Sequence, residues 1–108
     1  METLTAGENI MEALELGIHD LALIGEYYAA KESTPNLAMP PRNALYIALG
    51  GISAEKHVLG VVGKIKTASL QDALLVLPFD KVVDMLTFLD IWAEKVLALL
   101  RIMRSPHY

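Results

Sequence analysis

The chain has 108 residues, of which 54% are hydrophobic, and its formal net charge is −4. This length predicts a single domain with its own core, and the apolar fraction is high enough that part of it should face a partner. The absence of cysteine excludes disulfides, zinc–thiolate sites and thiol catalysis. The chain has no run of uncharged apolar residues as long as a membrane span requires, which is about 18, so no transmembrane helix is expected.

The acidic residues are concentrated at the start of the chain. Residues 1–32 contain seven acidic residues against one lysine, whereas the remainder is mildly basic. Binding to a phosphate backbone requires clustered lysine and arginine, so direct contact with RNA is disfavoured. This distribution instead suits packing between helices, within one chain or between copies.

The first predicted helix begins at Thr5, because Thr5-Ala-Gly-Glu8 matches the capping box. Its apolar stripe consists of Met11, Leu14, Ile18, Leu21 and Tyr28. Gly7 and Gly25 lie on this stripe, where they would allow another helix to approach closely. The alternative is a helix that breaks near Gly17, because glycine weakens a helix interior by about 1 kcal/mol.

Residues 31–42 are rich in proline, serine and threonine and form the predicted loop. A short helix is expected at 43–49, ending at Gly50-Gly51. Ser53 is a good N-cap for the helix that follows it. A further helix should begin at Thr67 or Ser69.

A corner is predicted at Leu77, Pro78, Phe79 and Asp80. Proline has no N–H to donate within a helix, and it biases Leu77 away from the helical conformation. Pro78 therefore ends one helix, and the side chain of Asp80 can cap the next.

The last helix is predicted to begin near Lys81 and to end before Pro106, and it has two apolar faces. We assign one face to the core, because its heptad-like spacing fits a continuous helix contact; it consists of Val82, Leu86, Leu89, Val96 and Leu100. We assign the other to a partner interface, because aromatic residues and methionine are enriched at interface centres; it consists of Met85, Phe88, Trp92, Leu99 and Ile102. The reverse assignment of the two faces remains open.

The residues with potential for catalysis form no recognisable motif. His19, His57 and His107 are far apart in sequence, and no spacing indicates a metal site. We therefore predict a non-enzymatic protein with no cofactor and no metal. The alternative is a small helical enzyme or ligand-binding domain that uses His19, His57 and the acidic first helix.

One central group and three upstream groups of residues carry a resemblance to a known family. The central group is Ala-Leu-Leu-Val-Leu-Pro-Phe at 73–79, then Val82-Val83, then Phe88-Leu-x-x-Trp92. The upstream groups are Leu-Thr-Ala-Gly-Glu at 4–8, with Met-Glu-Ala-Leu at 11–14, and two segments within 48–65. Together they resemble the C-terminal helical domain of the WD-repeat proteins of the UTP-B subcomplex, part of the small-subunit processome. Residues 94–108 depart from the family pattern.

The resemblance implies a role in assembly. It implies that residues 1–108 form one helical assembly domain of a larger WD-repeat protein of the nucleolus. It also implies pairing with the homologous C-terminal domains of sibling proteins, or with copies of itself when isolated. The expected fold is all-α, a bundle of antiparallel helical hairpins with a long C-terminal helix and a flexible loop near 31–42.

Overall fold

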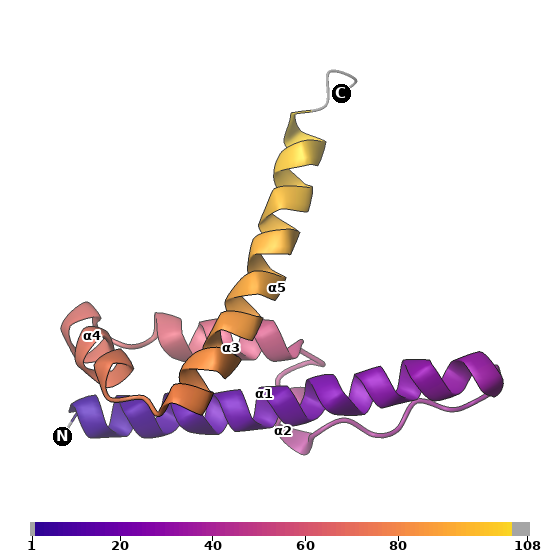
Figure 1. The fold of residues 1–108 in the computed structure, drawn as a ribbon, viewed down its shortest axis with the longest axis horizontal. Helices are drawn as coiled ribbons and strands as arrows, with labels where there is room; N and C mark the ends of the chain where they lie inside the picture. The colour runs from indigo at the N-terminus through magenta and orange to yellow at the C-terminus, as the bar shows by residue number, and fades with distance from the viewer. Residues whose placement is uncertain (1, 105–108) are drawn as a thin grey trace.

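The computed structural model describes residues 2–104, with side chains from Thr5 onward (Figure 1). Its helices are α1 (Glu2–Ser33), α2 (Ala44–Ala48), α3 (Ala54–Gly63), α4 (Thr67–Leu75) and α5 (Phe79–Met103). Within this described part of the chain there is no β-strand. The predicted all-α class and the long C-terminal helix are therefore confirmed. The expected end of the last helix at Pro106 lies outside the described residues.

Helix α1 is a single element of 32 residues that forms the base of the fold (Figure 1). Thr5 lies inside α1, which begins at Glu2, so the predicted capping box does not mark the start of the helix. The helix also continues through Gly17, because this position makes a tertiary contact that the break hypothesis did not consider.

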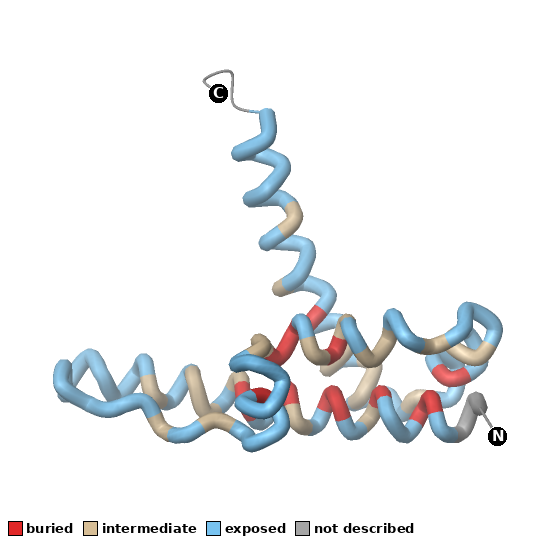
Figure 2. The backbone as a smooth tube through the Cα atoms, turned by 180° about the vertical axis from the view of Figure 1, so that it is seen from behind, coloured by how far each residue is buried: buried red, intermediate tan, exposed pale blue. Residues whose placement is uncertain are grey.

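The core lies between the first half of α1 and the helices α3, α4 and α5 (Figure 2). Its buried hydrophobic residues come from every helix and are Ala6, Ile10, Ala13, Leu14, Tyr46, Ala54, Val58, Ala73 and Phe88. The core therefore covers only part of the two long helices.

Helix α5 crosses α1 at Gly17, where the Phe88 ring fills the space that a side chain would need. This corrects the prediction that Gly7 and Gly25 would allow the close approach. Around both of those positions, within the described part of the chain, a Cβ would meet nothing within 4 Å. Tyr28, expected to complete the apolar stripe, is 57% exposed because it lies beyond the core.

The loop predicted at 31–42 begins later, because α1 continues to Ser33. Residues 34–43 return along the second half of α1 (Figure 1). The Tyr27 hydroxyl donates a hydrogen bond of 3.3 Å to the Leu37 carbonyl. The Asn43 side chain accepts from the Leu45 N–H at 2.8 Å and so caps α2. Gly50 and Gly51 follow α2 with φ of +89° and +77°, a conformation that favours glycine.

The break before α5 lies between Leu75, where α4 ends, and Phe79, where α5 begins. The Pro78 carbonyl accepts hydrogen bonds from the Lys81 and Val82 N–H groups, each at 3.0 Å. Asp80 lies in the first turn of α5 rather than at the cap, which Pro78 occupies, so the cap assignment was wrong. Its carboxylate is still favourable there because it faces the positive end of the helix dipole.

Helix α4 begins one residue after Lys66, which occupies its N-cap position. Of the two expected caps, Thr67 is its first residue and Ser69 lies within its first turn. Ser53, in contrast, occupies the N-cap position of α3 as predicted, but its side chain makes no capping hydrogen bond.

The second half of α5 rises away from the rest of the fold (Figures 1 and 2). The radius of gyration is 16.6 Å, whereas a compact domain of this length has about 13 Å. Residues 97–104 are all exposed. Much of the apolar surface of α5 is therefore uncovered in the single chain.

Candidate interaction site

The face of α5 that we predicted to meet a partner is exposed in its second half and covered in its first half. Trp92, Leu99 and Ile102 are 46%, 56% and 70% exposed. Met85 is half-buried against the core, and Phe88 is fully buried. The expectation that Phe88 lies on a shared surface was therefore wrong, because its ring packs against Gly17 where α5 crosses α1.

The face that we assigned to the core is largely exposed. Leu86, Leu89 and Leu100 are 58%, 42% and 45% exposed, whereas Val82 and Val96 are partly buried. The core assignment was wrong for the three leucines because α5 contacts the domain along one side, at Phe88 and through Lys95 and Val96 next to α3, and the leucines lie off that side. Both faces of its second half therefore present apolar side chains to solvent.

A groove of about 320 Å³ runs between α3 and α5. Its apolar lining comes from Leu59, Trp92, Val96 and Leu99. It continues the exposed apolar surface toward Ile102, and so provides a concave start to a surface that could hold another helix.

The Lys95 ammonium donates a hydrogen bond to the Glu55 carboxylate at the edge of this groove, joining α5 to α3. Glu55 is buried, and burial by itself raises the pKa of its carboxyl group. The hydrogen bond from Lys95 acts in the opposite direction, and the net effect is a lowered pKa. Glu55 is thus held as an anion and connects α3 to α5 through Lys95.

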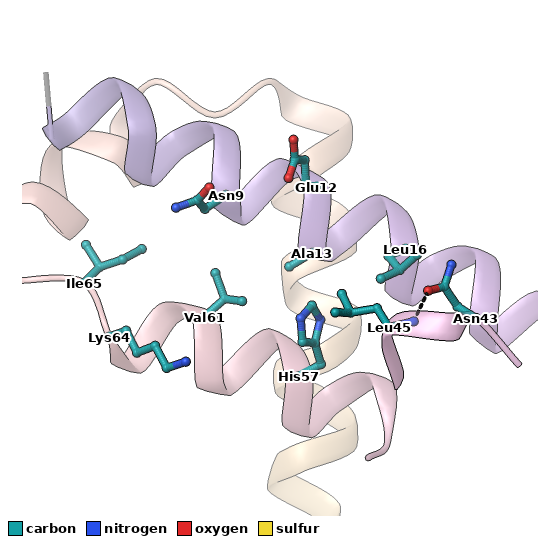
Figure 3. A pocket seen from close by; sticks show the side chains of 10 residues that line it. All are labelled: Asn9, Glu12, Ala13, Leu16, Asn43, Leu45, His57, Val61, Lys64 and Ile65. Carbon is teal, nitrogen blue, oxygen red and sulfur yellow. Dashed lines mark hydrogen bonds between the residues drawn. The ribbon is translucent and has the colours of Figure 1, made fainter. Parts of the chain in front are cut away.

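A larger groove, of about 500 Å³, lies between α1, α2 and α3 (Figure 3). His57 lies in it between Leu45 and Val61, opposite Ala13. Burial, together with the charge of Lys64, lowers the pKa of His57. The edge of its ring meets Tyr46, with the ring centroids 5.5 Å apart. His57 is therefore a neutral packing residue at neutral pH.

The structure does not bring the two candidate histidines together. His19 lines a separate depression with Asp20, Pro41 and Arg42. Over residues 2–104, no three histidine, aspartate or glutamate side chains converge in a way that could hold a metal ion. His107 lies outside the described residues. The alternative of a ligand or catalytic site shared by His19 and His57 thus lacks a common cavity.

Sequence reasoning did not find the ion pair between Asp20 and Arg42. Asp20 is 3% exposed, and its two carboxylate oxygens accept from Arg42 Nε at 3.1 Å and Nη2 at 2.9 Å. The guanidinium also lies over the Tyr46 ring, 4.8 Å from its centroid. Burial, followed by the charge of Asp20, raises the pKa of Tyr46 to about 12. This ion pair holds the end of the loop against α1. The sequence indicates it only by the presence of one arginine, Arg42, in the loop that follows an acidic helix.

Several known proteins are similar to this chain over most of its length. WD repeat-containing protein 3 of Mus musculus is 38% identical over 90 residues, which is 83% of this chain. The Homo sapiens protein of that name is 38% identical over 86 residues, or 80% of the chain. U3 small nucleolar RNA-associated protein 12 of Saccharomyces cerevisiae is 33% identical over 96 residues, also 83% of the chain.

The chain is homologous to a segment of WD repeat-containing protein 3. It spans only about 10% of the length of these relatives. No family model matches it. The resemblance noted in the sequence is thereby confirmed. None of the helices in the described part of the chain combines the length and hydrophobicity that crossing a membrane would require.

Proposed function

We propose that this chain is a non-catalytic assembly domain of a larger WD-repeat protein in the small-subunit processome. It joins subunits of that nucleolar complex, which takes part in ribosome biogenesis and rRNA processing. It does so by pairing with homologous helical domains of sibling proteins, or with copies of itself when isolated. The docking surface is the groove face of α5, which we define as Trp92, Leu99 and Ile102.

The observation that carries this proposal is the exposed end of α5, where residues 97–104 are all exposed. The chain exposes 7793 Å² of surface, whereas a folded monomer of 11.8 kDa exposes roughly 5,900 Å². Short isolated helices are marginal in water, and a helix that is apolar on several sides requires cover. A partner that packs on α5 would supply this cover.

The names of the relatives support an assembly role for this chain. One of them is named for association with U3 small nucleolar RNA, and the others are named for WD repeats. Because their names denote association and repeats rather than a reaction, they favour an assembly role over catalysis. The separation of His19 from His57 supports the same choice.

The test uses the full-length WD-repeat protein that contains this chain, tagged and purified from nucleolar extract. The amount of U3 RNA recovered with it is measured. Leu99→Glu/Ile102→Glu should reduce the recovered U3 RNA, because two charges would be placed in the apolar docking surface. Leu75→Glu is the matched control, since Leu75 is 83% exposed on α4 and away from this surface. Undiminished recovery with the double variant would rule out the groove face of α5 as the docking surface.

A further inference from the structure

The second half of α5 carries another exposed surface, which we call the leucine–arginine face and define as Leu97, Leu100, Arg101 and Arg104. All four residues are exposed. With about 100° between successive residues of a helix, this face lies roughly 160° around α5 from the groove face. One straight partner helix cannot cover two surfaces on opposite sides of α5.

The exposed area is large enough for two contacts. The excess over a compact monomer is roughly 1,900 Å², and a standard interface covers about 800 Å² on each partner. This excess belongs to the whole chain, including the exposed second half of α1 and the loop, and it leaves room for a second contact beyond the groove face.

The leucine–arginine face is complementary to a partner helix that is both acidic and amphipathic. Around the helix, Arg104 lies between Leu100 and Leu97, and Arg101 lies on the other side of Leu97. A partner must therefore offer carboxylates beside apolar or aliphatic surface. The outer side of α1 offers this chemistry. Its row of exposed carboxylates consists of Glu8, Glu12, Glu15 and Glu26. Of these, Glu15 also forms an ion pair of 3.2 Å with Lys81 at the start of α5 in the same chain.

The arginines cannot reach the acidic row of their own chain. The end of α5 rises away from α1 (Figure 1). Arg101 lies in the last turn of α5, and Arg104 is its C-cap, so both lie at this end. Glu8 and Glu12 lie near the start of α1 at its base. Contact between the two surfaces therefore requires a second copy.

We propose that the leucine–arginine face of α5 docks on the acidic outer side of α1 in a second copy of this chain. The inference rests on the proposed pairing of homologous domains and adds a second, head-to-tail contact to it. Such a contact uses different surfaces on its two sides, so each copy keeps its groove face available for another neighbour.

A charge exchange in the 108-residue chain tests this contact by sedimentation equilibrium at low salt. Arg101→Glu/Arg104→Glu and Glu8→Arg/Glu12→Arg should each weaken self-association about tenfold or more, because like charges then face each other. Combining the four substitutions should restore the affinity to within about threefold of the starting chain, since the pairs are re-formed in reverse. Circular dichroism of each variant establishes that the helices are retained.

The matched control is Glu32→Lys/Asp72→Lys, which changes the net charge as much as Glu8→Arg/Glu12→Arg but on other exposed surfaces. It should leave the affinity unchanged. A combined variant that associates no better than the two separate ones would overturn the proposal, as would a starting chain that remains monomeric. Either result is distinct from failure of the proposed function, which is measured by recovery of U3 RNA with the groove-face variant.

Discussion

The Phe88 ring rests directly on Gly17, so that a Cβ at Gly17 would lie 2.5 Å from the Phe88 Cζ atom. This contact fixes the point at which α5 crosses α1. It also explains how α1 tolerates a glycine in its interior, since the cost in helix propensity is offset by burial of an aromatic ring.

Gly17→Ala should destabilise the fold by about 1–3 kcal/mol, because the added methyl group overpacks the crossing point. Gly25→Ala is the control. The surroundings of Gly25 are open, so alanine there should raise the unfolding free energy by up to about 1 kcal/mol through its better helix propensity. Urea unfolding of both variants measures the difference. Equal stabilisation of the two would mean that Phe88 does not pack on Gly17.

Phe88→Glu should prevent folding, whereas Leu89→Glu should leave the helices intact. The first change removes a ring that is 1% exposed and buries a charge, at a combined cost above about 4 kcal/mol. The second places a charge at a position that is 42% exposed. Circular dichroism at equal protein concentration distinguishes them, and a folded Phe88→Glu variant would contradict the burial of this ring.

Local signals in the sequence were sufficient to find the helices, but not the packing of α5. Gly50-Gly51 and Pro78 end helices for reasons that belong to their own backbones, so their effect could be predicted. The two apolar faces of the last helix were equally visible in the sequence. Which of them is buried depends on Gly17, 71 positions before Phe88, and a regular heptad spacing carries no information about that distant space.

Arg42→Ala should cost about 3 kcal/mol of stability, because it leaves the buried carboxylate of Asp20 without its partner. Arg42→Lys should recover only part of this loss, since lysine cannot reproduce the two parallel hydrogen bonds or the stacking on Tyr46. Lys31→Ala removes an exposed cation that lies 5.5 Å from the centroid of the Tyr27 ring, so it should cost at most about 1 kcal/mol. Thermal unfolding of the three variants provides the comparison.

The stability of the fold should decrease as the pH falls below about 6.5. The pKa of His57 is lowered from 6.5 in the folded chain, so the unfolded chain binds the proton more readily in this range. His57→Gln should reduce this decrease between pH 7.5 and 5.5. His19→Gln, at an exposed position, should leave it as it is. Urea unfolding at several pH values tests this, and the same slope in all three proteins would show that His57 does not contribute.

The ion pair between Asp20 and Arg42 shows that contacts between residues far apart in the sequence could not be predicted from it. In the sequence, Asp20 is indistinguishable from the solvent-exposed carboxylates of the acidic helix, and Arg42, which follows two prolines, is predicted only as part of a loop. Only the return of residues 34–43 along α1 places them together. The histidines show the converse, because a residue type associated with catalysis proved at His57 to be a packing residue beside Tyr46.

The partial contact of α5 with the domain has a consequence for amide hydrogen exchange. Near Phe88 the backbone can exchange only when the core opens, whereas near Ile102 fraying of the helix end is sufficient. The isolated chain should therefore show protection that declines along α5 over the last ten or so residues. When a partner covers this end, protection should become uniform along the helix. The profile of exchange along α5 thus reports, residue by residue, how much of the helix an assembly encloses.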